Sequence, residues 1–198
     1  MVGYGRLRDL FDDAPTPHIA HPPHTHHRDY YLATDGSFAP DRGGLGAIVE
    51  TSDGDRVLRL ALEARSPNNN VAEYRALRFG LDALAARVEP GVSVGVLLDH
   101  DDLASNVNAA ALGMLSPGWP DGPVRVPPAG AADWGDIRLA IRRFGDLRAA
   151  AIRSDDNPAH ALANAPERYR HLEVEPHANR RDWEIPPPSR ADRPRASD

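Results

Sequence analysis

The segment at residues 68–84 reads NNNVAEYRALRFGLDAL and sets apolar side chains at helical spacing. The apolar side chains that recur every three or four residues are Val71, Tyr74, Leu77, Leu81 and Leu84. This period predicts an amphipathic helix over residues 70–84. Asn70 is placed to cap the N-terminus of this helix, with Glu73 three residues later as its partner in a capping box.

Three strand-like segments precede this helix. Residues 30–37 are rich in strand-forming side chains, and residues 43–50 and 55–62 form two further apolar runs. The turn at residues 51–54 contains Asp-Gly, which favours a tight hairpin and therefore antiparallel strands. After the helix, residues 92–98 form a continuous apolar run, which is typical of a strand buried on both faces in the middle of a sheet.

The rest of the chain completes an α/β pattern. The expected elements are a helix at 101–115, a loop at 116–130, a helix within 134–144, a strand at 147–152 and a short helix at 158–165. This order predicts a layered architecture in which an antiparallel hairpin portion joins parallel crossovers. We expect residues 1–27 to be an irregular His/Pro-rich arm and residues 166–198 to be a mobile, polar, Pro/Arg-rich tail.

The composition narrows the possible chemistry. The chain has 198 residues, a formal net charge of -6, no Cys and no Lys. The lack of Cys excludes disulfides, thiolate metal sites and Cys nucleophiles. No apolar run approaches the roughly 18–20 residues of a membrane span, so we expect no membrane partner. The lack of Cys fits a reducing, cytoplasmic location, and we expect a monomer. The net acidity by itself argues against tight, nonspecific binding to nucleic acid.

Three carboxylates fall at places where the predicted fold would bring them together. Asp35 lies inside the first strand, where an unpaired charge is costly to bury, and Asp99 follows the buried strand at 92–98. If these two strands are neighbours, the two carboxylates lie side by side, and the helix can place Glu73 over the same point. Three such oxygen donors suit a hard divalent cation such as Mg²⁺, and two ions can activate a water for phosphodiester hydrolysis.

Each of these carboxylates also has a purely structural interpretation. Glu73 would serve as the capping-box partner of Asn70, and Asp99 would begin a turn or cap the helix that starts at Asp101. Asp35 is harder to explain in this way, because Asp-Gly inside a strand is unfavourable unless a bulge or a site requires it. The three together are more specific than any one of them.

Four motifs resemble the type 1 ribonuclease H family, and they lie within residues 28–165. The most specific is NNNVAEYRAL at 68–77, and ATDGS at 33–37 with the Gly-rich run that follows is similar to the family's opening. Leu97-Leu98-Asp99 is similar to the third acidic motif, and DNPAHALAN at 156–164 to the fourth. The surplus of acidic residues, with Arg in place of Lys, resembles that of haloarchaeal members.

This resemblance implies a ribonuclease H-like five-stranded mixed sheet flanked by helices, with strands 1–3 antiparallel and strands 1, 4 and 5 parallel. It implies a two-metal endonuclease that uses Mg²⁺ or Mn²⁺ to cleave the RNA strand of RNA-DNA hybrids. The implied metal ligands are Asp35, Glu73 and Asp99. The implied contacts to phosphates and 2′-hydroxyls in the minor groove are Gly36, Ser37, Asn69 and Asn70.

The fourth motif departs from the family's pattern, because His160 stands where Asp is normal. Imidazole is a poorer ligand than carboxylate for Mg²⁺ and a relatively better one for Mn²⁺, so we expect a catalytic His160 to shift the metal preference. Asp155 or Asp156 is an alternative ligand for the second metal. A surface histidine on a short helix is the structural alternative for His160.

Two other functions remain open at this level. The first is a catalytically inactive nucleic-acid binding module of the same fold, and the second is another metal nuclease built on it. The segment at 116–130 lacks the family's basic handle, since Arg125 is its only basic residue. Hybrid binding would then depend on the arm at 1–27, whose five histidines are also candidate metal ligands, or on a set of arginines: Arg75, Arg78, Arg138, Arg142, Arg143 and Arg153.

Overall fold

The computed structural model describes residues 5–15, 27–115 and 125–169. Its strands form one five-stranded sheet in the order β3-β2-β1-β4-β5. The strands are β1 (Tyr30–Phe38), β2 (Gly43–Thr51), β3 (Arg56–Glu63), β4 (Ser93–Leu98) and β5 (Asp146–Ala151). The α-helices are α1 (Leu7–Asp13), α2 (Asn69–Ala85), α3 (Asp101–Leu115), α4 (Ala131–Ile141) and α5 (His160–Asn164). The short 3-10 turns within these described residues are η1 (Pro128–Gly130), η2 (Ser154–Asp156) and η3 (Pro166–Arg168).

The pairing of the strands confirms the predicted sheet. β1 pairs antiparallel with β2, and β2 pairs antiparallel with β3. β1 also pairs parallel with β4, and β4 pairs parallel with β5. The turn between β2 and β3 uses Gly54 with a φ of 89°, a left-handed conformation that glycine adopts without strain.

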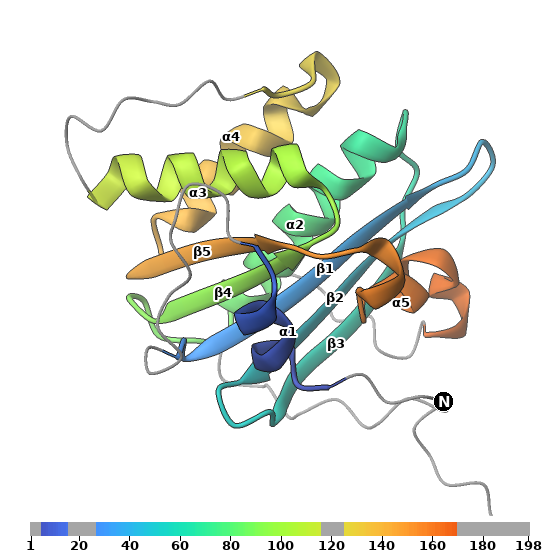
Figure 1. Ribbon diagram of the computed structural model, residues 1–198. Helices are drawn as coiled ribbons and strands as arrows, with labels where there is room; N and C mark the ends of the chain where they lie inside the picture. Colours follow the sequence, from blue (N-terminus) through green and yellow to red (C-terminus); the bar gives the residue numbers. More distant parts are fainter. Residues whose placement is uncertain (1–4, 16–26, 116–124, 170–198) are drawn as a thin grey trace, which may run out of the picture.

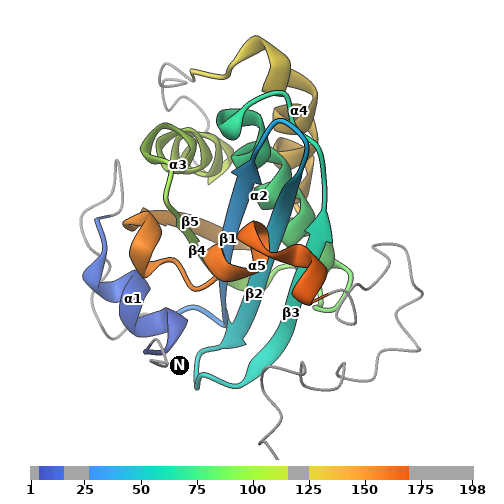
Figure 2. The same ribbon diagram turned by 90° about the vertical axis from the view of Figure 1, so that its right-hand side faces the viewer.

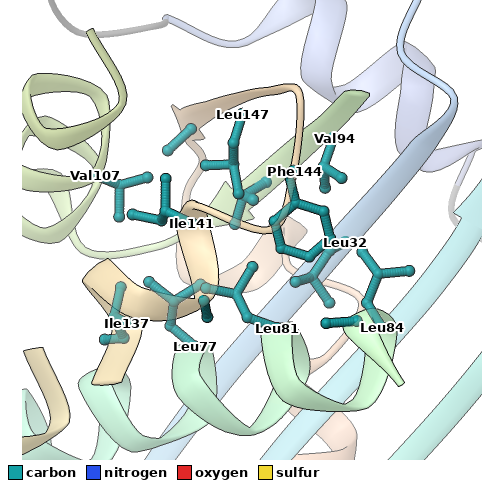
Figure 3. Close-up of a cluster of buried hydrophobic side chains, with 14 of the residues drawn as sticks. Leu32, Leu77, Leu81, Leu84, Val94, Val107, Ile137, Ile141, Phe144 and Leu147 are labelled. Atoms are coloured by element: carbon teal, nitrogen blue, oxygen red, sulfur yellow. The ribbon is translucent and has the colours of Figure 1, made fainter. Parts of the chain in front are cut away.

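Helices cover both faces of the sheet (Figures 1 and 2). Successive side chains of a strand point to opposite faces of the sheet, so neighbouring residues of β1 belong to the hydrophobic cores on opposite faces. Leu32 packs with α2, α3 and α4, whereas Tyr31 and Ala33 pack with α1 and α5. Figure 3 shows the larger core, where Leu77 and Leu81 of α2 lie against Leu32 and the α4 side chain Ile137. The site described below lies at one end of this two-sided sheet.

The N-terminal helix α1 was not predicted, because residues 1–27 read as irregular. Its side chains Leu7 and Phe11 are almost fully buried on the face shared with α5. The buried carboxylate of Glu50 in β2 accepts a hydrogen bond from the Leu7 amide at 2.9 Å. Farther along, the Pro15 carbonyl accepts a hydrogen bond from the Ala151 amide of β5. The segment at 5–15 is therefore an integral part of the folded domain.

The predicted cap of α2 is also corrected by the structure. The N-cap is Asn68, whose side chain accepts a hydrogen bond from the Val71 amide at 3.0 Å. The helix therefore begins earlier, and Asn70 lies inside its first turn. Glu73 is then free of a capping role and is available to the site.

Several sequence-based expectations fall outside the described residues. These are the histidines at 18–26, most of the loop at 116–130 and the tail beyond residue 169. Within the described part of the chain, no helix is both long and apolar enough to cross a membrane.

Candidate metal and nucleic-acid site

The parallel pairing of β1 with β4 brings Asp35 and Asp99 together. The register pairs Ala33 with Leu97, and Asp35 and Asp99 each lie two residues farther along their strands. β4 ends at Leu98, whereas β1 continues to Phe38 alongside β2 only. The two carboxylates therefore meet where the sheet splits, as the sequence predicts for neighbouring strands.

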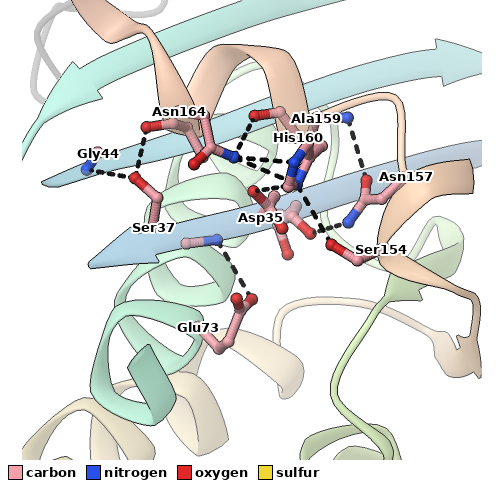
Figure 4. A network of polar contacts seen from close by, with 12 residues as sticks. Asp35, Ser37, Gly44, Glu73, Ser154, Asn157, Ala159, His160 and Asn164 are labelled. Carbon is pink, nitrogen blue, oxygen red and sulfur yellow. Dashed lines mark hydrogen bonds and ion pairs between the residues drawn. The ribbon is translucent and has the colours of Figure 1, made fainter. Parts of the chain in front are cut away.

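The first turns of α2 bring Glu73 to the same point. Gly36 makes this possible, because a Cβ at that position would collide with the backbone of Ala72. The close approach lets the Gly36 amide donate a hydrogen bond to Glu73 Oε2 at 3.2 Å. Figure 4 shows Glu73 reaching toward β1 beside Asp35. Glycine at position 36 thus fixes the distance between helix and strand.

These three carboxylates form a cluster of oxygen donors of the kind that can hold a cation. Asp35, Glu73 and Asp99 each offer an oxygen, and these atoms all lie within 4.8 Å of one another. Asp35 and Glu73 are buried, and the buried Asp99 Oδ1 has no hydrogen-bond partner among the described residues. An orphaned carboxylate oxygen facing two other acids is costly, and a divalent cation satisfies it. The donor set, which is all oxygen, suits Mg²⁺ or Mn²⁺.

The electrostatics of the cluster point to the same conclusion. Burial, together with the negative charge of Asp99, raises the pKa of Asp35 to about 8. Burial also raises the pKa of Glu73 to about 9, with added repulsion from Asp99 and Asp35, while the Gly36 amide opposes the rise. Burial and mutual repulsion therefore both disfavour the charged forms of Asp35 and Glu73 in the protein without a cation.

A second set of contacts attaches α5 to β1 and β2. The buried side chain of Asn157 donates to the Thr34 carbonyl at 2.8 Å and accepts from the Ala159 amide at 3.0 Å. The Ser37 hydroxyl donates to the Ala163 carbonyl at 2.6 Å and accepts from the Gly44 amide at 3.1 Å. These bonds hold the α5 turn beside Asp35 (Figure 4).

His160 lies at the start of α5 and faces the acidic cluster. Its Nδ1 is 3.4 Å from Asp35 Oδ2, and its side chain is 47% exposed. Ser154 Oγ lies 3.3 Å from the same nitrogen, and the Asn164 amide lies 3.2 Å from both ring nitrogens. Two polar neighbours thus hold the imidazole at the edge of the site.

The other residues predicted as substrate contacts or metal ligands are exposed, and one of them is in an ion pair. Asn69 and Asn70 are exposed in the first turn of α2. Asp156 is bound by the Arg153 guanidinium at 2.8 Å, so this carboxylate already has a cationic partner. Asp155 is exposed in the same 3-10 turn, η2.

Besides Arg153, two more of the arginines considered for nucleic-acid binding are engaged in ion pairs. Arg75 lies 3.4 Å from the buried carboxylate of Asp133 in α4. Arg78 lies 3.2 Å from the same residue and 3.0 Å from Asp136. Because these pairs join α2 to α4, both side chains contribute to helix packing.

Sequence reasoning missed the parts played by Asn164 and by the glycines of β2. A Cβ at Gly44 would collide with the Ala163 carbonyl, and one at Gly46 would lie 2.6 Å from the Ala159 carbonyl. Glycine inside a strand signals the close approach of another backbone, so this signal was present at both positions. The contact of Asn164 with His160 follows from the one-turn spacing on α5.

Comparison with known proteins places this geometry in a fold. No protein-family model and no curated protein matches the sequence. Among solved structures, the N-terminal RNase H domain of Rv2228c from Mycobacterium tuberculosis matches with a TM-score of 0.52 and 23% identity, covering 70% of this chain and 92% of that one. RNase H1 from Halobacterium salinarum matches with a TM-score of 0.54 and 19% identity, covering 69% and 95%. LC11-RNase H1, solved in complex with an RNA/DNA hybrid, matches with a TM-score of 0.51 and 20% identity, covering 68% and 94%.

At these sequence identities the matches support a shared fold, but they do not show membership of a family. The halobacterial protein has a lower sequence identity to this chain (19%) than the mycobacterial domain has (23%), so the comparison does not support the haloarchaeal resemblance seen in the composition. The strand order and the parallel and antiparallel pairings agree with the expected sheet. The chain therefore has the ribonuclease H fold.

Proposed function

We propose that this protein is a divalent-metal-dependent endonuclease that hydrolyses the RNA strand of RNA-DNA hybrids. The observation that carries the proposal is the cluster of Asp35, Glu73 and Asp99 at the split between β1 and β4, with its orphaned Asp99 oxygen. Glu73 accepts a hydrogen bond from the Gly36 amide, but no hydrogen bond among the described residues accounts for Asp99 Oδ1 beside two other acids. We propose further that the enzyme acts as a cytoplasmic monomer.

The three carboxylates would hold Mg²⁺ or Mn²⁺, in a site that takes two ions. A bound pair of ions supplies an activated water and stabilises the leaving oxygen of the phosphodiester. Two of the negatively charged ligands, Asp35 and Asp99, would come from β1 and from the end of the adjacent strand β4. The third, Glu73, would come from helix α2. His160 acts as a fourth group beside Asp35, where its contacts with Ser154 and Asn164 orient the ring.

The residues proposed to contact the hybrid differ in how many of their hydrogen-bonding groups are already used inside the protein. The amide of Gly36 already donates to Glu73, and the Ser37 hydroxyl is used between β1, β2 and α5. Asn69 and Asn70 are exposed, and their amides can donate to or accept from a 2′-hydroxyl, the group that distinguishes RNA from DNA. The two asparagines therefore carry most of the proposed strand recognition.

A second candidate function is a nucleic-acid binding module without catalysis. The observation that favours it is His160 at 3.4 Å from Asp35, in the place where the resemblance leads us to expect an acid. Loss of one carboxylate leaves fewer charges to hold a second cation. The two functions share a surface and differ in whether the hybrid is cut.

An assay with a labelled RNA-DNA hybrid separates the two functions. The full chain is incubated with the hybrid and Mg²⁺ or Mn²⁺, beside RNA duplex and single-stranded DNA. Asp35→Asn tests the site, and Asp136→Asn is the matched control, because Asp136 is an exposed acid on α4. We expect cleavage of the hybrid's RNA strand that only Asp35→Asn removes. Hybrid binding without cleavage would favour the module.

A further inference from the structure

A pocket of about 580 Å³ adjoins the proposed site and has no part in the function described so far. It lies between the turn joining β1 to β2, the end of β3, and the segment that follows α5. Ser37 and Asn164 line it, and they are the residues that touch the Ala163 carbonyl and the His160 ring. Figure 4 shows both beside Asp35. Two residues whose contacts hold the α5 turn and the His160 ring beside Asp35 therefore also line the pocket, although none of the three carboxylates does.

The lining combines an aromatic ring with charges of both signs. Phe38 lines the pocket and is 41% exposed. Within the described part of the chain, the other large apolar side chain left exposed is Leu139 on α4. Arg42 and Arg65 stand at the pocket as exposed guanidinium groups. The carboxylates in the lining are Asp41, Glu63 and Glu167.

We propose that this pocket takes an unpaired nucleobase of the bound nucleic acid, stacked on Phe38. The proposal rests on the proposed function and extends it to a substrate class, namely hybrids that carry a single-stranded extension. An aromatic side chain is a stacking platform for any base, and arginines beside it contribute cation–π contacts and hold the adjoining backbone. The volume lies within the range of small-molecule pockets.

The charges in the lining favour a base over a phosphate. The lining holds carboxylates as well as guanidinium groups, so it offers no excess of positive charge to an anion, whereas a neutral base presents N–H donors to carboxylates such as Asp41 and Glu167 and acceptors to the guanidinium groups. Phosphates flanking the base would stay at the exposed Arg42 and Arg65. Because the pocket lies on one side of Asp35, only the two strand ends at one end of the duplex are placed to reach it, and they would enter it with opposite polarity.

The test measures binding in an Asp35→Asn background, so that the substrate stays intact. Five short hybrids are compared by fluorescence anisotropy: one blunt, and four with a two-nucleotide extension at a different strand end. A 2-aminopurine in each extension reports stacking. Phe38→Ala removes the platform, Phe38→Trp keeps an aromatic ring, and Leu139→Ala is the matched control for loss of an exposed apolar side chain.

We expect one of the four extensions to tighten binding on the order of tenfold, the gain that stacking of one base brings. That gain should vanish in Phe38→Ala and persist in Phe38→Trp and Leu139→Ala, with quenched 2-aminopurine emission wherever it persists. Equal binding of blunt and extended hybrids, or a gain that survives Phe38→Ala, would overturn the base pocket alone. Failure to bind any hybrid would overturn the proposed function as well.

Discussion

His160 Nδ1 lies 3.4 Å from Asp35 Oδ2, so an imidazole stands at the edge of a cluster of three carboxylates. Replacing this ring with a carboxylate adds a hard oxygen donor, which Mg²⁺ favours more than Mn²⁺ does. We predict that His160→Asp raises the ratio of Mg²⁺-supported to Mn²⁺-supported hybrid cleavage by roughly tenfold, the effect expected of about 1.4 kcal/mol of ligand preference. Rates with each metal in both proteins check this. Identical metal profiles would show that His160 has no part in the site.

The burial of these acids, together with their mutual repulsion, predicts a pH-dependent gain in stability from removing one of them. In the unfolded chain Asp and Glu ionise near pH 4, whereas the folded pKa values of Asp35 and Glu73 are about 8 and 9. Between these limits the folded state holds protons that the unfolded chain has released, so the free energy of unfolding falls as pH rises. Asp35→Asn should therefore raise the melting temperature in EDTA, and more so at pH 9 than at pH 5. A constant difference between the two pH values would contradict this.

Metal binding is predicted to oppose the same repulsion. A divalent cation at the three carboxylates stabilises the folded state and not the unfolded chain, so the melting temperature should rise with Mg²⁺ or Mn²⁺ concentration. This rise should be lost in Asp35→Asn and kept in Asp136→Asn. Thermal unfolding in EDTA and in a metal series measures it. An equal rise in wild type and Asp35→Asn would place the bound cation elsewhere.

The seating of α5 on β2 depends on the absence of a side chain at Gly44. A Cβ there would collide with the Ala163 carbonyl, so Gly44→Ala should displace α5, cost roughly 1–3 kcal/mol of stability and reduce cleavage. Gly135→Ala is the matched control, because a Cβ there meets nothing within 4 Å and Gly135 lies inside α4. That control should gain about 0.5–1 kcal/mol. Denaturant unfolding gives both values, and a harmless Gly44→Ala would refute the close packing.

The N-terminal helix is predicted to be needed for stability. Phe11 is buried, with its ring centroid 5.6 Å from that of Tyr31. Phe11→Ala should cost about 3–5 kcal/mol, and Asp9→Ala, an exposed change on the same helix, should cost little. Denaturant unfolding of the wild type and the two variants gives the free energies of unfolding that check this prediction. A small effect of Phe11→Ala would mean that α1 is dispensable.

The sheet and the acidic cluster could be predicted from the sequence because their signals are periodic and local. The apolar run before Asp99 marks a buried strand, and the helical period before and after Glu73 marks α2. Asp35 attracted attention because a charge inside a strand pattern needs a partner. Parallel pairing of β1 with β4 then requires Asp35 and Asp99 to be neighbours.

Other features could not be predicted, because they depend on contacts between distant segments. Helix α1 spans only Leu7–Asp13, and its folding depends on burial of Leu7 and Phe11 and on the carboxylate of Glu50, 43 residues beyond Leu7. Three consecutive asparagines offer three possible N-caps, and the sequence does not distinguish Asn68 from Asn70. The bond from Asn157 to the Thr34 carbonyl joins positions 123 residues apart.

Cleavage of an RNA-DNA hybrid labelled on its RNA strand is the measurement that tests the central claim most directly. The claim is that Asp35, Glu73 and Asp99 hold divalent cations, and that a water activated by these cations hydrolyses the RNA strand. It predicts metal-dependent cuts within the RNA strand by the wild type and by Asp136→Asn, and a loss of at least a thousandfold in Asp35→Asn, about 4 kcal/mol of transition-state stabilisation. Cleavage by Asp35→Asn at the wild-type rate, or no cleavage by the wild type with either metal, would contradict it.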